Sequence, residues 1–225
     1  MSIQGNPFTI HDSSLVLSLD AANIKSYIGS GTTWNDLSGN GNNFTLANGP
    51  TSNKFGLVLD GTNDHAYLLH NGGLAFNTGN YTISAWHRNE NSDVGYNGII
   101  TNDNTADDTW KIFRDINQSF YKARTNATIL SFPAYTIGRF HHYAFTFTGG
   151  VLQLYFDGVV GNSTTGVPNP VYNTTMAIGS YRYSDAIASR YLTNQTIGGV
   201  YLYNRSLSAS EILQNYNATK SRFGL

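Results

Sequence analysis

Residues 140–158, FHHYAFTFTGGVLQLYFDG, alternate between bulky apolar residues and smaller or polar ones on both sides of a Gly-Gly pair. Such a period of two is typical of a β-strand with one buried face. Gly149 and Gly150 supply a two-residue turn, because glycine adopts positive φ angles without a steric cost. The stretch therefore predicts a β-hairpin whose apolar side faces a core.

Two adjacent histidines, His141 and His142, lie in the first strand of this hairpin. Successive side chains of a strand point to opposite faces of the sheet. The two rings therefore cannot converge on one metal ion or one substrate atom, as metal ligands must. We predict that both histidines are structural.

Short stretches with a strand pattern recur along the chain, separated by clusters of Gly, Asn, Asp and Ser that are typical of turns. They cover residues 14–20, 55–61, 65–70, 81–88, 98–100, 109–115, 119–124, 140–157, 174–180 and 197–205. Their spacing of roughly 8–12 residues is typical of β-sandwiches. A length of 225 residues fits one all-β domain. We expect a single domain over residues 1–225.

The end of the chain shows a helical pattern instead. Ser208 and Glu211 form the Ser-x-x-Glu pattern of a capping box, and Leu207 and Ile212 are spaced as a hydrophobic staple. The residues that follow carry an apolar stripe at helical spacing. The pattern predicts one short helix over about 208–219 that packs on the sandwich.

The composition excludes several classes of partner. Charged residues make up 12% of the chain and the net charge is −1, which gives no electrostatic reason to expect nucleic acid or an anionic membrane. The absence of Cys excludes disulfides and thiolate metal sites. Residues 1–10 lack the features of a secretion signal, and no apolar run approaches the ~20 residues of a membrane helix. We expect a protein that folds in a cytoplasm and does not insert into a membrane.

Four segments resemble the laminin-G-like jelly rolls of the concanavalin A-like lectin/glucanase superfamily, in the order found in that family. They are residues 19–46, which include the stretch TTWNDLSGNGNNFTL, residues 59–68 (LDGTNDHAYL), residues 140–158, and residues 197–212 (IGGVYLYNRSLSASEI). The resemblance implies an all-β fold, a two-sheet antiparallel jelly-roll sandwich with six or seven strands in each sheet. Many family members carry an Asp-Glu pair just before the last strand. Gly198 and Gly199 stand there in this chain, so the roles of that pair, metal binding included, are not carried over.

The ending YNRSLSASEILQNYNATKSRFGL (203–225) is similar to versions of this fold in structural proteins of tailed bacteriophages. That likeness implies a component of the virion surface, assembled in the host cytoplasm. Its partners would be other virion proteins and a cell-surface glycan or polysaccharide. Assembly into a homo-oligomer is left open.

Hydrolysis of a glycan needs two carboxylates across the scissile bond. The resemblance implies that glucanases of the superfamily place two Glu, with an Asp between them, on one face of one strand. The only glutamates of this chain are Glu90, in a loop, and Glu211, in the helix cap, so they cannot form that motif. Asp107 and Asp108 are adjacent and would diverge on a strand. We predict that the chain is not an enzyme.

A calcium site is one interpretation of the loop NDLSGNGNN (35–43). Asp36, Ser38, Asn40 and Asn42 stand at alternate positions, which lets oxygen ligands converge on a hard cation. Only one of the four is a carboxylate. The alternative is a tight turn in which Asn and Asp side chains bond to nearby backbone.

Three loops mix aromatic rings with amide and carboxylate side chains, a combination that holds a sugar by its C–H face and its hydroxyl groups. They span residues 88–98, 102–110 and 180–191. The carbohydrate-binding candidates are the aromatic residues Tyr96, Trp110, Tyr181 and Tyr183 and the polar residues Asn102, Asp103, Asp107, Arg182 and Asp185. The alternative for Trp110 is a place in the core, as expected for Trp34 and Trp86.

These patterns together predict a non-enzymatic carbohydrate-binding or adhesion module. The alternative from another class is a purely structural virion decoration or fibre subunit whose aromatic loops contact protein neighbours. A glycoside hydrolase is a third alternative.

Overall fold

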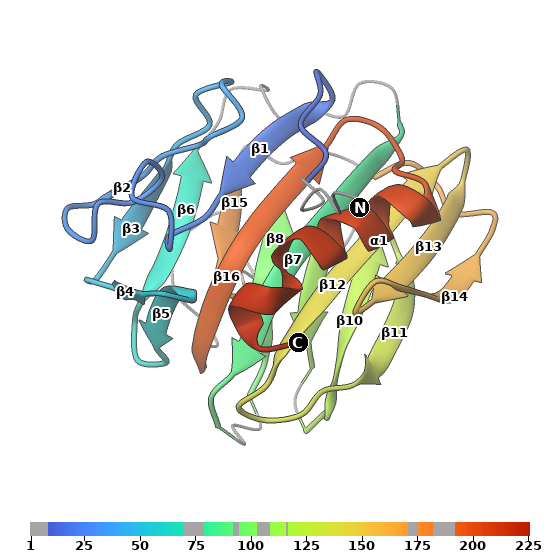
Figure 1. Cartoon of the computed structure of the whole chain (residues 1–225). Coiled ribbons are helices and arrows are strands. Elements are labelled where there is room, and N and C mark those ends of the chain that lie inside the picture. The colour runs from blue at the N-terminus through green and yellow to red at the C-terminus, as the bar shows by residue number, and fades with distance from the viewer. Residues whose placement is uncertain are drawn as a thin grey trace, which may run out of the picture.

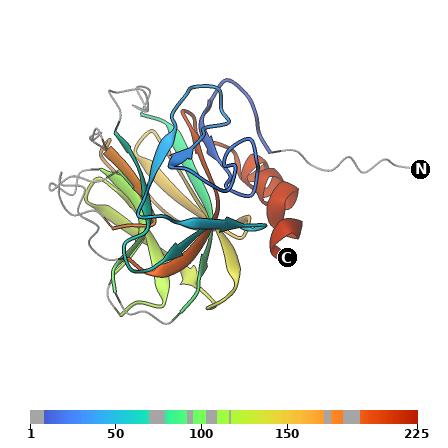
Figure 2. The same ribbon diagram turned by 90° about the vertical axis from the view of Figure 1, so that its left-hand side faces the viewer.

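The computed structural model describes residues 9–69, 79–91, 95–102, 109–115, 117–170, 175–181 and 192–225. They form two antiparallel sheets of eight strands each, stacked as the two layers of a sandwich (Figures 1 and 2). The predicted all-β jelly-roll sandwich with one C-terminal helix is confirmed. Each sheet has eight strands and not the six or seven that the resemblance implies.

Sheet A has the order β14-β13-β12-β7-β16-β5-β4, and β1 also pairs with β16. Its strands are β1 (Leu15–Leu19), β4 (Thr51–Asn53), β5 (Gly56–Asp60), β7 (Tyr81–Asn89), β12 (Phe140–Thr148), β13 (Val151–Phe156), β14 (Val159–Thr164) and β16 (Asn194–Tyr203). Edge strand β14 lies at one side of this sheet.

Sheet B has the order β11-β10-β9-β8-β15-β6-β3-β2. Its strands are β2 (Thr33–Trp34), β3 (Phe44–Ala47), β6 (His65–Leu69), β8 (Asn97–Asn102), β9 (Trp110–Arg114), β10 (Phe120–Thr125), β11 (Thr128–Ala134) and β15 (Thr175–Ile178). Edge strand β11 lies on the same side of the sandwich as β14 (Figure 1).

The predicted hairpin is formed by β12 and β13, in the register Thr148 to Val151. Gly149 and Gly150 have φ angles of 55° and 78°, as such a turn requires. Of the side chains expected in the core, Phe145, Phe147 and Leu154 are buried, whereas Phe156 is only half-buried because it lies at the edge of the sandwich.

The two histidines of the hairpin point to opposite faces of sheet A, as predicted. Tyr143 and the ring of His141 are on the inner side, where His141 stacks on Phe156 with ring centroids 4.8 Å apart. His142 is on the outer side, 5.1 Å from Trp86 between ring centroids. The strand geometry therefore keeps the two rings from sharing a ligand.

The predicted helix is confirmed as α1 (Ala209–Thr219), followed by the 3-10 turn η1 (Lys220–Phe223). Ser208 is the N-cap, and it forms the capping box with Glu211. The helix covers the outer face of sheet A (Figures 1 and 2), where Trp86 stacks between Tyr216 and Phe223. In the described part of the chain, no helix is long and apolar enough to span a membrane.

Candidate functional site

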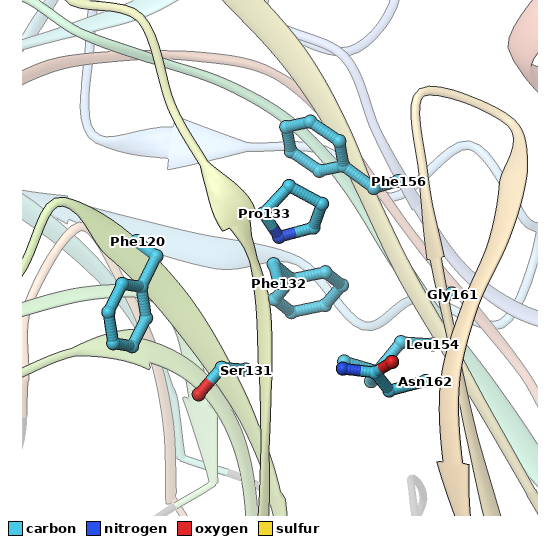
Figure 3. A pocket seen from close by; sticks show the side chains of 8 residues that line it. All are labelled: Phe120, Ser131, Phe132, Pro133, Leu154, Phe156, Gly161 and Asn162. Atoms are coloured by element: carbon cyan, nitrogen blue, oxygen red, sulfur yellow. The ribbon is translucent and has the colours of Figure 1, made fainter.

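A groove of about 320 Å³ lies where the open edges of the two sheets meet, between β11 and the strands β13 and β14 (Figure 3). Its walls combine aromatic or ring-shaped side chains with two small polar ones: Phe120, Phe132, Pro133, Phe156, Ser131 and Asn162. We call this cavity the edge groove. All of its lining residues come from β10, β11, β13 and β14, so the groove is part of the sandwich framework.

The aromatic wall of the edge groove is held in place by core contacts. Phe132 is buried and meets Tyr143 edge to face, with ring centroids 5.1 Å apart. Phe156 contacts Phe132 and Tyr143 at centroid distances of 6.5 Å and 5.3 Å. Rings fixed by several neighbours lose little freedom when a ligand packs on them.

The other wall is fixed by Gln153, which lies at an irregularity in the pairing of β13 with β14. Its side-chain amide donates to the backbone oxygens of Leu154, Gly161 and Asn162 at 3.0, 2.8 and 3.1 Å. These bonds hold β14 at its distance from β13.

The polar groups of the edge groove are available to a ligand. The hydroxyl of Ser131 and the side-chain amide of Asn162 form no hydrogen bond with other described residues, and Figure 3 shows Asn162 directed toward Phe132. None of the residues that line the groove is titratable. The arrangement is therefore suited to binding an apolar face with hydroxyl groups, and it offers no acid or base for catalysis.

Two of the predicted sugar-binding aromatics come together on the outer face of sheet B. The rings of Tyr96 and Tyr181 stack with centroids 5.3 Å apart, and the ammonium of Lys111 lies 4.6 Å from the Tyr181 ring. Gly98 makes this possible because a Cβ there would lie 2.2 Å from the backbone oxygen of Ser180. Sugar binding by Tyr96 and Tyr181 stays a prediction.

Two other candidates face the core instead. Trp110 is fully buried and Asn102, its register partner, is 1% exposed. The amide of Asn102 donates to the Thr175 backbone oxygen at 3.1 Å. Trp110 therefore has no exposed face for a sugar. The alternative prediction, that Trp110 lies in the core, is confirmed. The remaining candidates lie outside the described residues: Asp103, Asp107, Arg182, Tyr183 and Asp185.

The predicted calcium loop is held by hydrogen bonds. Oδ1 of Asp36 accepts from the backbone N–H groups of Ser18 and Ser38, both at 2.9 Å. Oδ2 accepts from the Ser38 hydroxyl at 2.7 Å and from the Asn42 N–H at 3.1 Å. The side chains of Asn40 and Asn42 donate to backbone oxygens of β1. This is the geometry of the alternative interpretation, a turn held by its own side chains.

No cluster of three or more His, Asp or Glu side chains suited to a metal ion occurs within the described ranges. Calcium binding by the loop of Asp36 stays a prediction that the geometry does not require.

The comparisons with known proteins agree with the jelly-roll geometry. A family model described as the concanavalin A-like lectin/glucanases superfamily matches residues 60–213, more than half of the chain. The chain belongs to the concanavalin A-like lectin/glucanases superfamily. A search among curated protein sequences finds no match.

Solved structures of known proteins share this superfamily fold. A sialidase of Trypanosoma rangeli, solved in complex with sialic acid, is 19% identical with a TM-score of 0.72, and the match covers 94% of this chain and 34% of the sialidase. The binding domain of Botulinum neurotoxin DC, in complex with rat synaptotagmin II, is 16% identical with a TM-score of 0.69, and the match covers 93% of this chain and 52% of that domain. The chain spans a third to a half of these proteins, and at this identity they show the fold alone.

Members of the superfamily include glucanases, so the two glutamates are of interest. Glu90 accepts from Arg88, with Nη2 2.7 Å from Oε1, and also contacts Thr196. Glu211 is bound by Arg205 at 2.7 Å, and hydrogen bonds from this arginine lower the pKa of Glu211 to about 2. A glycosidase acid needs a raised pKa, so Glu211 is unsuited to that role.

Proposed function

We propose that this member of the superfamily is a carbohydrate-binding or adhesion module without catalytic activity, and that the edge groove holds a neutral saccharide unit. The observation that carries the proposal is the pair of free polar groups, on Ser131 and Asn162, beside a fixed aromatic wall. A pyranose ring has apolar C–H faces and a rim of hydroxyl groups, which match these two kinds of surface.

Solved structures with the same fold also support a carbohydrate-binding role. The toxin binding domain was also solved in complex with SialylT, with a TM-score of 0.68 and 16% identity. A shallow groove with two polar contacts gives a weak individual site. Useful attachment would then depend on several copies acting together, because linked sites raise the overall affinity without new contacts.

The test begins with a glycan array, screened with and without calcium, to identify a bound saccharide. The affinity of that saccharide is then measured for the double variant Ser131→Ala/Asn162→Ala. Two lost hydrogen bonds at about 1 kcal/mol each predict an affinity lower by roughly tenfold to thirtyfold. The matched control is Ser163→Ala, since this neighbouring residue on β14 faces away from the side chain of Asn162.

Unchanged affinity of the double variant would remove the edge groove from consideration. If Tyr96→Ala abolished binding in the same assay, the sugar site would instead be the aromatic pair on the outer face of sheet B.

A second candidate function, a structural module that contacts protein neighbours, is favoured by one observation. Edge strand β14 exposes Val159 and Val160 to 66% and 53%, and edge strand β11 exposes Ile129 to 42%. Unpaired edge strands with apolar side chains are suited to pairing with another chain. Light scattering of the double variant Val159→Lys/Val160→Lys tests this role, which predicts loss of a self-associated species.

For the setting of the module we propose the surface of a tailed-phage particle, assembled in the host cytoplasm beside other virion proteins. The support is the resemblance of residues 203–225 to phage structural proteins. Immunogold labelling of particles produced by a host that expresses the protein tests it. Gold on purified particles is expected, and unlabelled particles would refute the setting while leaving the edge-groove proposal intact.

A further inference from the structure

A second cavity, of about 460 Å³, lies on the outer face of sheet A where the chain leaves η1. Its walls include Phe55 from the turn between β4 and β5, Arg88 from β7, Arg139 and Phe140 at the start of β12, and Phe223 from η1. We call it the basic pocket. It has no lining residue in common with the edge groove.

Aromatic rings form the floor of the basic pocket. The Phe55 and Phe140 rings have centroids 5.6 Å apart, and Phe140 and Phe223 are 4.4 Å apart. The guanidinium carbon of Arg88 lies 4.9 Å from the Phe140 centroid and 5.5 Å from that of Phe55. Phe140 and Phe223 are buried, whereas Phe55 is half-buried and is the most exposed of the three rings.

Two cations of this region, Arg139 and Lys54, have no acidic side-chain partner among the described residues. Arg88 is paired with Glu90 through both Nε and Nη2. Arg139 and Lys54 are exposed and form no ion pair or hydrogen bond through their side chains with other described residues, and the Lys54 ammonium lies 4.9 Å from the Phe55 centroid. Arg139 and Lys54 thus bring two positive charges, which no described acidic side chain pairs, to one apolar floor.

We propose that the basic pocket binds a saccharide unit that bears an anionic group, with the anion on the Arg139 guanidinium and a C–H face of the ring on Phe55. A guanidinium presents parallel N–H donors that match a carboxylate or a sulfate. An inorganic anion alone would leave the aromatic floor unused.

Two other anionic partners fit less well. Nucleic acid is bound by neutralising many phosphates along a basic stripe. Anionic membranes attract clusters of 4–8 Lys or Arg residues. Two unpaired cations beside a single ring face are more suited to one charged sugar.

The experiment measures binding of three probes by calorimetry: oligogalacturonate, which carries carboxylates, dextran sulfate oligosaccharide, and neutral dextran oligosaccharide. We expect binding of at least one charged probe that depends on Arg139, whereas any binding of neutral dextran should be unchanged by Arg139→Ala. Arg139→Ala should weaken that binding by about tenfold or more, because hydrogen bonds to charged groups contribute about 1.5–3 kcal/mol. Lys54→Ala, a second exposed position, should weaken it by a smaller factor.

The matched control is Lys122→Ala, which changes the net charge equally on sheet B, where Lys122 pairs with Asp115. This variant should stay within about twofold of the parent chain, as exposed charges beyond a Debye length are screened. If Lys122→Ala and Arg139→Ala lost equal affinity for the charged probe, net charge alone would explain the binding, and the proposal would be overturned. Binding of phosphatidylserine vesicles, without binding of either charged saccharide, would also overturn it.

The basic pocket and the edge groove are tested separately. The double variant Ser131→Ala/Asn162→Ala should keep the affinity for the charged probe, and Arg139→Ala should keep the affinity for the neutral saccharide. Loss of both activities in either variant would contradict the assignment of two sites.

Discussion

Nδ1 of His141 lies 2.8 Å from Oδ2 of Asp157, the residue that begins the turn between β13 and β14. Nε2 of the same ring accepts the backbone N–H of Thr136 at 3.1 Å, so the ring carries its proton on Nδ1 and donates it to the carboxylate. The other carboxylate oxygen, Oδ1, accepts the N–H of His142 at 2.8 Å. Asp157 therefore ties the turn to the start of β12, and His141 is a structural residue.

Replacing Asp157 by Ala should destabilise the protein by about 2–4 kcal/mol, through two lost hydrogen bonds and a φ angle of 50° that alanine adopts poorly. Asp157→Asn should cost about 1 kcal/mol, because Asn tolerates this φ and keeps the bond from His142. Denaturant melts measure both values. A loss below about 0.5 kcal/mol for Asp157→Ala would contradict the role given to this contact.

Acid should destabilise the fold through two buried histidines. Burial lowers the pKa of His87 to about 3 and that of His142 to about 4. Nε2 of His87 lies 2.9 Å from Oε1 of Gln195 and 3.3 Å from the hydroxyl oxygen of Tyr121. Nε2 of His142 lies 3.2 Å from the hydroxyl oxygen of Ser84. Because both pKa values lie below the ordinary 6.5, the unfolded chain takes up these protons first as the pH falls.

Stability should therefore be lost as the pH falls from about 6 to 4.5, with each histidine contributing about 1.4 kcal/mol per pH unit. His142→Gln should remove about half of the joint slope of the two residues. Denaturant melts at several pH values measure the slope, and NMR titration of the His142 ring checks its cause. An unchanged slope in His142→Gln, or a ring that titrates near pH 6.5, would contradict the prediction.

Strands with an apolar alternation could be read from the sequence, and exposed edge strands could not. β7, β12, β13 and β16 carry that alternation, although β7, β12 and β16 prove to be buried on both faces, which the pattern of one buried face did not predict. β14 is VVGNST and is almost wholly exposed, and β11 contains Pro133, which only an edge strand tolerates well. The sequence pattern therefore predicts neither strand. Because the edge groove is lined by residues of both strands, the sequence does not predict the groove either.

The candidate sites show the same limit. Tyr96 and Tyr181 were predicted from loop composition and meet because Gly98 allows a close crossing of two backbones. Whether Trp110 faces the core depends on its register with β8, which composition does not encode. The basic pocket joins residues from 55 to 225, so no short sequence motif predicts it. The capping box of Ser208 and Glu211 was predictable because it is local.

The loop of Asp36 should behave as a hydrogen-bonded turn. Asp36→Asn replaces Oδ2 by an amide that cannot accept from Asn42 N–H, so we expect a loss of about 1–2 kcal/mol. Melting curves in chelator and in millimolar calcium should coincide for the parent chain. A calcium site would instead add about 2.7 kcal/mol at a hundred times Kd. A melting temperature lowered by chelator in the parent chain, but not in Asp36→Asn, would establish calcium binding.

The ring of Phe223 takes the space above Gly198, which lies within β16 and not before the last strand as the resemblance implies. A Cβ on Gly198 would lie 2.6 Å from two ring atoms of Phe223 and 2.9 Å from Cβ of Trp86. Phe223 stacks on Trp86 with centroids 4.4 Å apart, and Trp86 Nε1 donates to Thr219 Oγ1 at 2.9 Å. Glycine at this position thus lets the end of the chain dock on sheet A.

Gly198→Ala should displace Phe223 and destabilise the protein by about 1–3 kcal/mol, the usual cost of overpacking. Phe223→Ala frees the space, so the double variant should lose less than the sum of the two single variants. The control is Gly95→Ala, because a Cβ at Gly95 would meet nothing within 4 Å. Denaturant melts of the four proteins and the parent chain give the coupling energy. Additive losses would mean that Gly198 and Phe223 do not constrain each other, and another contact would have to explain how η1 docks.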